Sequence, residues 1–381
     1  MKKRYIVRSQ LIAILLILAL VSFACAQLTP ASTTPSPTML PAGPVATGIV
    51  PLTVPIATAT EPPAGSLQIY FTDPTSLRAI NYIGGLDQDL VAALDQARLS
   101  VDVAAYSLNM WSIRDALIDA HKRGVQVRMV MESDNMDIKE VQQMKAAGIP
   151  VIGDQRQGLM HNKFIVIDRL DVWTGSMNFT NGGVYRDNND LIHIRSGAVA
   201  EDYSNEFQQM YINNLFGPDK KTGTPNSKVT IAGVPVEIYF SPEDKPASRI
   251  LELIIAAQKS VFFLAYSFTS DLMASAMLER ANAGVEVAGI MDDGQVKNNQ
   301  GTEFDTFRNA NLDVRLDGNL HGLMHHKLII IDQKIVITGS YNFTAAAETT
   351  NDENMLVIFS PQVAAKCMEE FQSVYHQAQL P

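Results

Sequence analysis

The residues best suited to chemistry form one pattern, His-x-Lys-x4-Asp-x6-Gly-Ser-x-Asn, which occurs twice in the chain. Its members are His161, Lys163, Asp168, Gly175, Ser176 and Asn178 in the first copy and His325, Lys327, Asp332, Gly339, Ser340 and Asn342 in the second. The two copies lie 164 positions apart. Each fixed position matches by chance about once in twenty, so an accidental duplicate of six positions is very improbable. The repeated pattern therefore indicates a functional site.

This set of side chains suits a phosphodiester. Lysine supplies a fixed positive charge, while serine and asparagine offer neutral hydrogen-bond donors to the non-bridging phosphate oxygens. Histidine can act as a nucleophile or as a proton donor near neutral pH. We therefore predict that the histidines and lysines are catalytic and that Ser176, Asn178, Ser340 and Asn342 bind substrate. No metal site is expected, because a lysine beside each histidine would repel a cation.

Each copy predicts a hairpin, with β-branched and aromatic runs on both sides of a polar turn. A two-residue turn at Arg169 and Leu170 would place Lys163 opposite Ser176 and His161 opposite Asn178. The same register in the second copy pairs Lys327 with Ser340 and His325 with Asn342. Asp168 and Asp332 belong to the motif and are counted with its catalytic set. They have the opposite strand parity, however, so we expect them to close the turns rather than serve as acids.

The elements that must position these residues are also duplicated. Ala105-Tyr106-Ser107 matches Ala265-Tyr266-Ser267, and Gly158 to His161 matches Gly322 to His325. Strands alternating with helices over about 150 residues predict an α/β domain, here present twice. We place the domains at residues 66–216 and 228–381, on either side of a linker near Phe216 to Ser227 that contains glycine and proline. Because both histidines lie in one chain, a monomer suffices for a complete site.

At the two motifs, the chain resembles the phospholipase D superfamily over roughly residues 66 to 381. The resemblance implies two tandem α/β/α sandwich domains with pseudo-twofold symmetry and one shared active site at their interface. It also implies that one histidine attacks phosphorus to form a phosphohistidine. The other histidine would protonate the leaving group and then activate water. The resemblance implies no metal and no cofactor.

The halves differ fourteen residues after the motif glycine, where the second has Glu353 and the first has Asn189. In the family, a carboxylate in this region orients the catalytic histidine, and Asp190 is a candidate substitute in the first half. A carboxylate partner stabilises imidazolium. Taking each residue as the partner of the histidine in its own half, we predict that His325 is the proton donor and His161 the nucleophile. The alternative is sequence drift at a tolerant position.

The N-terminus predicts export. Four basic residues precede the apolar run Leu11 to Phe23, and Ala24-Cys25-Ala26 follows, which predicts a signal peptide over residues 1–26. Cleavage before Gln27 and lipidation at Cys25 both remain open, whereas an uncleaved anchor is disfavoured because the run is shorter than about 20 residues. Residues 27–65, rich in proline, threonine and serine, predict a disordered tether. The enzyme is therefore expected in the cell envelope, lipid-anchored or secreted.

The formal net charge is −10, which argues against a broad grip on nucleic acid. We therefore favour a phosphodiesterase that hydrolyses phospholipid headgroups at a membrane surface. An exported endonuclease and a phosphatidyltransferase of the cardiolipin synthase type remain alternatives. A binding module without activity is disfavoured, because no motif residue is lost. Beside the second motif, His321 and His326 are candidates for the rim of the cleft, while Cys367 is expected to be a buried apolar residue.

Overall fold

A computed structural model describes residues 65–378 of the chain. The predicted signal peptide, Cys25 and the predicted tether up to residue 64 lie outside the described residues. Among the residues that are described, no helix is both long enough and apolar enough to span a bilayer.

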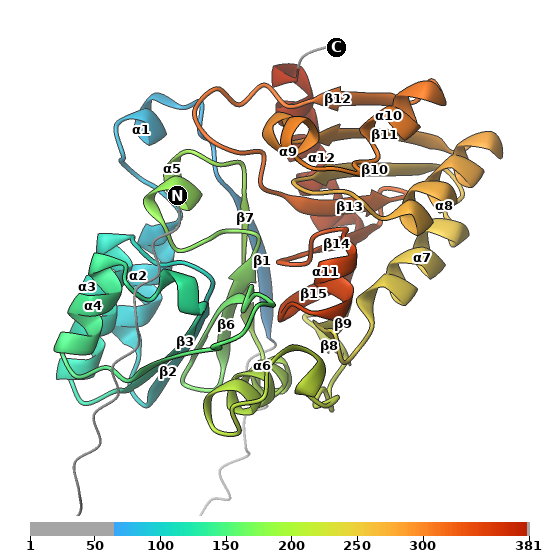
Figure 1. Cartoon of the computed structure of the whole chain (residues 1–381). Coiled ribbons are helices and arrows are strands. Elements are labelled where there is room, and N and C mark those ends of the chain that lie inside the picture. Colours follow the sequence, from blue (N-terminus) through green and yellow to red (C-terminus); the bar gives the residue numbers. More distant parts are fainter. Residues whose placement is uncertain (1–64, 379–381) are drawn as a thin grey trace, which may run out of the picture. The chain divides into compact units, whose positions relative to one another are not determined.

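The first half is built on a seven-stranded sheet with the order β1-β7-β6-β5-β2-β3-β4. Helices α2, α3 and α4 lie along one face of this sheet (Figure 1). The strands are β1 (Ser66–Phe71), β2 (Ser100–Ala105), β3 (Gln126–Met131), β4 (Val151–Gly153), β5 (Lys163–Ile167), β6 (Asp171–Gly175) and β7 (Asp190–Arg195). The helices are α1 (Leu77–Ile80), α2 (Asp87–Gln96), α3 (Trp111–Lys122), α4 (Lys139–Ala146), α5 (Asn181–Tyr185) and α6 (Gly197–Tyr211).

The second half repeats this plan on an eight-stranded sheet with the order β12-β11-β10-β13-β14-β15-β9-β8. Its strands are β8 (Lys228–Ile231), β9 (Val234–Ser241), β10 (Ser260–Ala265), β11 (Glu286–Met291), β12 (Asp313–Leu316), β13 (Lys327–Ile331), β14 (Ile335–Gly339) and β15 (Glu353–Phe359). Its helices are α7 (Pro246–Ala256), α8 (Asp271–Asn282), α9 (Asp293–Asn298), α10 (Phe304–Asn309), α11 (Ala345–Thr349) and α12 (Pro361–Gln377). The predicted class, two tandem α/β domains, is confirmed.

Alternation of side chains along the strands produces separate cores on the two faces of each sheet. In β5, Ile165 packs with the outer helices α2, α3 and α4, whereas Phe164 and Val166 face a central cluster. That central cluster joins the two halves, because it also contains residues of β10, β13 and β14. Helices α6 and α12 contribute Tyr203 and Cys367 to it. Cys367 is buried, as predicted, and it is a free cysteine among the described residues.

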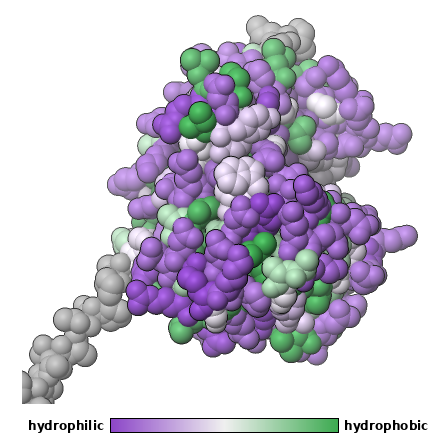
Figure 2. Space-filling view, turned by 90° about the vertical axis from the view of Figure 1, so that its left-hand side faces the viewer, coloured by the Kyte–Doolittle hydropathy of each residue, from purple (hydrophilic) through white to green (hydrophobic). Residues whose placement is uncertain are grey.

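The outer face of the first half is mainly hydrophilic, with hydrophobic residues scattered across it (Figure 2). Helix α3 buries Ile113 and Leu117 against the sheet, so the polar residues of this helix face the solvent.

The hairpin register differs by one residue from the prediction. Ile167 pairs with Asp171, so the loop has three residues, and the same register carries Lys163 opposite Gly175 rather than Ser176. Asp168 and Arg169 adopt φ values of 53° and 54°, and the second hairpin repeats this with Asp332 and Gln333. The loop contains no glycine that would indicate such left-handed positions, and a two-residue turn was therefore predicted. The expected opposition of histidine to asparagine is therefore wrong in both copies.

Candidate active site

The two motif histidines lie just before β5 and β13, where short backbone bridges join the halves. The His161 N–H donates to the Asp352 carbonyl at 3.0 Å, and the Asp352 N–H donates to Leu159 at 2.8 Å. The second copy repeats this arrangement, since the His325 N–H donates to the Asn188 carbonyl at 3.0 Å. Each histidine is therefore held beside the segment that precedes the last strand of the opposite half.

These bridges exchange the predicted histidine partners between the halves. His161 Nδ1 lies 2.7 Å from Glu353 Oε2, and His325 Nδ1 lies 2.9 Å from Asn189 Oδ1. The prediction paired each histidine within its own half, so its assignment of Glu353 to His325 is wrong. The error has a physical cause. The Asp352 backbone is hydrogen-bonded to His161, so the next residue, Glu353, lies beside the histidine of the opposite half. His161 thus has the carboxylate partner and His325 has the neutral one.

The motif serines hold these partners in place. Ser340 Oγ donates to Glu353 Oε2 at 2.7 Å, and Ser176 Oγ donates to Asn189 Oδ1 at 2.9 Å. Both serines are fully buried. Their hydroxyl groups donate to Glu353 and Asn189 rather than pointing to a substrate. The prediction that the serines bind substrate directly is therefore replaced by a role in orienting these two histidine partners. Asn189 is fixed further, because its Nδ2 donates to the Gly183 carbonyl at 3.0 Å.

The hydrogen bonds also define the histidine tautomers. The carboxylate of Glu353 and the amide oxygen of Asn189 are both acceptors, so Nδ1 of each histidine carries the proton. In neutral His161, Nε2 then keeps a free lone pair, which is the form that a nucleophile requires.

Both motif lysines are buried beside the histidines. Lys163 Nζ donates to the His161 carbonyl at 2.6 Å, and Lys327 Nζ donates to the His325 carbonyl at 2.7 Å. Burial lowers the pKa of Lys163 well below its usual value. Burial also lowers the pKa of Lys327, to about 7. Both ammonium groups are therefore poorly solvated, and an anionic phosphate would relieve that cost.

Two tyrosines, which stand out in the sequence only as part of the repeat, complete the surroundings of the histidines. The ring of Tyr106 lies 5.0 Å from that of His161 and 5.1 Å from Lys163 Nζ. Tyr266 is equivalent, with its ring 4.7 Å from both His325 and Lys327 Nζ. The repeated Ala-Tyr-Ser could have predicted their position. It stands at the end of a buried strand, β2 or β10, and this strand pairs with the strand that follows each histidine.

Burial keeps both histidines neutral near pH 7 in the absence of substrate. It lowers the pKa of His161 to about 4, although Glu353 acts in the opposite direction. The pKa of His325 is also well below its usual value, because of burial together with the charges of Lys327 and Lys163. Although burial raises it, the pKa of Glu353 stays below its usual value because of His161 and Lys163, so Glu353 is ionised.

Asn178 and Asn342 remain candidates for binding phosphate. Each is only partly buried, and each has a buried Oδ1 atom without a hydrogen-bond partner among the described residues. An acceptor in this state costs free energy unless a donor such as water satisfies it, whereas a phosphate oxygen would accept a hydrogen bond from Nδ2 of the same amide. Their predicted role as substrate ligands remains a prediction.

The motif aspartates lie outside the catalytic cluster. Asp168 accepts hydrogen bonds from the backbone N–H groups of Arg98, Leu99 and Ser100, at 2.7 to 3.2 Å. Asp332 accepts the equivalent bonds from residues 258, 259 and 260. Both aspartates therefore fasten the hairpin loop to the start of the neighbouring strand. Their inclusion in the catalytic set is corrected to a structural role.

Asp190 and His326 form a separate buried pair rather than part of the cleft. His326 Nδ1 lies 3.3 Å from Asp190 Oδ1, and its Nε2 lies 3.0 Å from Glu370 Oε1. Burial opposes the charge of His326, but the bonds to Asp190 and Glu370 raise its pKa to about 9. Asp190 thus does not substitute as the partner of a catalytic histidine, and fully buried His326 does not line a rim. His321, by contrast, is exposed.

Within residues 65–378, no group of three or more histidine, cysteine, aspartate or glutamate side chains is arranged to hold a metal ion. The chemical resources described here are two neutral imidazoles, two poorly solvated ammonium groups and fixed partners on Nδ1. A neutral imidazole suits transfer of a phosphoryl group to its Nε2, whereas proton delivery to an oxygen leaving group requires the other imidazole to be protonated first.

Comparison with known proteins places the chain in a family. The model described as "Cardiolipin synthase, PLD-like domain" matches twice, at residues 90–211 and 250–375. The chain therefore belongs to the phospholipase D superfamily, and its similarity to a cardiolipin hydrolase and to a phospholipase D supports a phosphodiesterase-type hydrolase.

Individual relatives match about one half of the chain. A mitochondrial cardiolipin hydrolase of Chlamydomonas reinhardtii is 31% identical over 164 residues, covering 43% of this chain and 73% of the relative. A phospholipase D of Rickettsia bellii is 30% identical over 169 residues, covering 43% and 83%. The crystal structure of phosphatidylserine synthase from Haemophilus influenzae is 12% identical with a TM-score of 0.62, covering 82% of this chain and 87% of that one. This last likeness concerns the fold alone.

Proposed function

We propose that the protein is a phospholipase D-type phosphodiesterase, which hydrolyses phospholipid headgroup phosphodiesters through a phosphohistidine. The observation that carries this proposal is the pair of buried histidines, each beside a lysine and each held at Nδ1 by a partner from the other half. The neutral His161 supports its assignment as the nucleophile, and the cationic surroundings support binding of a phosphate monoanion.

In the first step, Nε2 of His161 attacks phosphorus, and the bond from phosphorus to the leaving oxygen breaks. Positive charge then develops on the His161 ring, where the ionised Glu353 at Nδ1 stabilises it. His325 enters this step as the imidazolium, protonated on both ring nitrogens, and donates its Nε2 proton to the leaving oxygen, which leaves a neutral ring with its proton on Nδ1. The neutral Asn189 suits this task, because a carboxylate partner would hold that proton more tightly.

In the second step, His325 accepts a proton from water as the water oxygen attacks phosphorus. The bond between phosphorus and nitrogen breaks, which regenerates neutral His161 and releases the phosphomonoester. His325 is left protonated for the next cycle. Lys163 and Lys327 stabilise the charge on the phosphate oxygens throughout, and Asn178 and Asn342 are proposed to donate hydrogen bonds to them. No step uses a cofactor or a metal ion.

Phospholipid is the favoured substrate class for three reasons. The chain is acidic overall, which disfavours extended contact with nucleic acid. The N-terminal sequence favours export to the cell envelope, either lipid-anchored at Cys25 or secreted, where a membrane surface is the available partner. The relatives described above include a cardiolipin hydrolase and a phospholipase D.

The test uses residues 27–381, the product expected from signal cleavage, in the presence of EDTA. Its substrates are vesicles of phosphatidylcholine or cardiolipin and, separately, single- and double-stranded DNA. We expect headgroup release or cardiolipin cleavage, no DNA cleavage, and loss of activity by orders of magnitude in His161→Ala and His325→Ala. Cleavage of DNA without lipid hydrolysis would instead identify the exported endonuclease.

Addition of glycerol as an acceptor separates hydrolysis from transfer. A hydrolase should still release mainly phosphatidic acid, because water reaches the phosphohistidine. Formation of phosphatidylglycerol as the main product would identify the phosphatidyltransferase alternative.

A further inference from the structure

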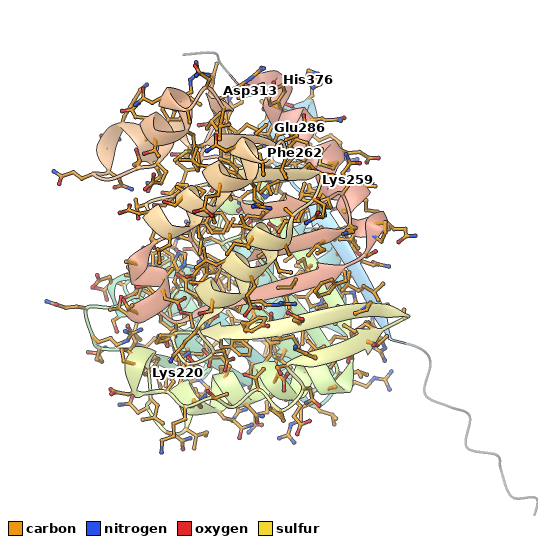
Figure 3. All side chains as sticks on the ribbon, turned by 90° about the vertical axis from the view of Figure 1, so that its right-hand side faces the viewer. Lys220, Lys259, Phe262, Glu286, Asp313 and His376 are labelled. Atoms are coloured by element: carbon orange, nitrogen blue, oxygen red, sulfur yellow. The ribbon has the colours of Figure 1, made fainter. Side chains whose placement is uncertain are left out.

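Lys220, in the linker between the halves, is buried in a cluster of carboxylates. Its side chain is 0% exposed, and its Nζ lies 2.5 Å from Glu206 Oε1, 3.1 Å from Glu243 Oε1 and 3.2 Å from Asp352 Oδ1. These carboxylates come from α6, from the loop after β9 and from the residue before β15. Figure 3 places Lys220 at the lower end of the molecule, near the ribbon of α6. A linker expected only to separate the domains thus contributes a buried charge.

The cluster would destabilise the fold if the Lys220 ammonium were not balanced by the surrounding carboxylates. Removal of one partner of a buried ion pair is strongly destabilising, because it leaves an uncompensated charge away from water. Burial opposes the charge on Lys220, but Glu206, Asp352 and Glu243 raise its pKa, so it stays protonated. Burial raises the pKa of Glu206 well above its usual value despite the lysine. Lys220 is therefore the fixed cation around which three acidic side chains are arranged.

One of these acids is directly connected to the active site. The Asp352 carbonyl accepts the His161 N–H at 3.0 Å, and the next residue is Glu353, the partner of His161 Nδ1. The Asp352 carboxylate is held from the linker by Lys220 and by the Gly217 N–H at 2.6 Å. Arg156 forms an ion pair with its other oxygen. The linker therefore holds the segment that presents Glu353 to His161.

The other half lacks this arrangement. Asn188, 164 positions before Asp352, is neutral and accepts a hydrogen bond from Asn319 Nδ2 at 2.9 Å. Glu370 is equivalent to Glu206, but its cationic neighbour is His326. The linker lysine thus acts only on the side of the site that has the charged partner, Glu353.

We propose that Lys220 is a positioning residue for the reaction, which holds Asp352 so that Glu353 stays aligned with His161 Nδ1. This proposal rests on the proposed function for its kinetic part, because it assumes that His161 is the nucleophile. Lys220 does not touch the reacting atoms. Its contribution is made through the Asp352 backbone and the carboxylate beside it.

The experiment compares Lys220→Met with Lys220→Arg and with a control, Arg249→Met. Arg249 is a suitable control because it also pairs with a glutamate, Glu237, at 2.7 Å, but on α7 and away from Asp352. Hydrolysis of bis(p-nitrophenyl) phosphate should show a kcat about 10- to 100-fold lower in Lys220→Met with KM nearly unchanged, because misalignment affects the attack rather than binding. Lys220→Arg should recover most of that loss. Arg249→Met should lower the Tm without lowering kcat.

Histidine NMR makes the test independent of catalysis. In the substrate-free protein, the Nδ1 proton of His161 should give a downfield resonance in wild type and Lys220→Arg, and that resonance should be lost or shifted in Lys220→Met. If wild type failed to cleave the diester while the resonance behaved in this way, the proposed function would be wrong and the positioning role would stand. An unchanged resonance and kcat in folded Lys220→Met would overturn the positioning role.

A second variant covers the case in which Lys220→Met does not fold. Asp352→Asn keeps the shape of the side chain but removes the charge on which Lys220 acts. It should reproduce both the kcat loss and the change in the His161 resonance. Wild-type values for both in Asp352→Asn would overturn the proposal.

Discussion

Glu353 and Asn189 occupy equivalent positions, yet one is charged and the other is neutral. Each accepts a hydrogen bond from Nδ1 of a histidine and from a motif serine. The two histidines therefore have the same tautomer but different electrostatic partners. The sequence argument gave the role of proton donor to the histidine with the carboxylate partner, and the exchange of partners removes that support. The proposed attack by His161 is supported instead by Glu353, which would stabilise the positive charge of the phosphohistidine.

Glu353→Gln should slow attack by His161. A glutamine can present its amide NH2 group to Nδ1, which would force the proton onto Nε2 and remove the nucleophilic lone pair. We expect kcat to fall by up to about 10,000-fold, the loss seen when a catalytic histidine is held in the wrong tautomer. Single-turnover kinetics with a p-nitrophenyl diester measure this step directly. A loss of less than threefold would show that Glu353 does not support the nucleophile.

Asn189→Asp is the complementary change on the other side of the site. The added carboxylate should raise the pKa of His325, so that the alkaline decline in activity moves to higher pH. The pH profile of choline release from a soluble short-chain phosphatidylcholine tests this expectation. A profile that moved to lower pH would contradict the assignment of His325 as the acid.

The wild-type pH dependence follows from the pKa values of the two histidines. His161 must be neutral, which its pKa of about 4 allows above that pH. His325 must be protonated, and its pKa lies well below its usual value. We therefore expect kcat/KM for an alkyl diester to be highest at acidic pH and to fall by about tenfold per pH unit on the alkaline side.

Above about pH 7, loss of the Lys327 charge should weaken substrate binding as well. A p-nitrophenyl diester is the control, because its leaving group departs without a proton and should show a smaller decline. A flat profile for the alkyl diester from neutral to alkaline pH would contradict these protonation states.

The hairpin that carries each motif depends on its aspartate for stability rather than for chemistry. Asp168 and Asp332 each bind three consecutive backbone N–H groups at the start of a neighbouring strand. Asp332→Ala should lower the free energy of unfolding by about 2 kcal/mol, the scale of hydrogen bonds to a charged group. The kcat of the folded variant should stay near wild type. Urea unfolding and kcat measured on one sample test both parts, and a large kcat loss at unchanged stability would restore a catalytic role.

The strands and hairpins of the site were predictable because their side chains alternate with a period of two. That alternation places Asp168 away from the chemistry. The register was not predictable, because non-glycine residues Asp168 and Arg169 occupy left-handed positions. The exchange of histidine partners between the halves was not predictable either. It depends on a backbone hydrogen bond between His161 and Asp352, which lie far apart in the sequence. The burial of Lys220 was not predictable either, because a charged residue in a linker that contains glycine and proline is expected to be exposed.

The two halves share one site, because each supplies a histidine to it and a partner to the other histidine. A mixture of His161→Ala and His325→Ala chains should therefore remain inactive, since every chain lacks one catalytic group. Wild-type specific activity should also be independent of protein concentration. Recovery of activity on mixing would show instead that sites form between chains, for example by exchange of halves.

Direct identification of the attacking nitrogen is the most informative measurement. In His325→Ala, bis(p-nitrophenyl) phosphate should still phosphorylate His161, because p-nitrophenolate needs no proton to leave, whereas hydrolysis of the adduct should stall without its base. We expect a burst of one p-nitrophenolate per enzyme and an acid-labile p-nitrophenyl phosphoryl group on the peptide containing His161, detected by mass spectrometry. The absence of a burst in His325→Ala, with an adduct on His325 in His161→Ala, would contradict the proposed mechanism.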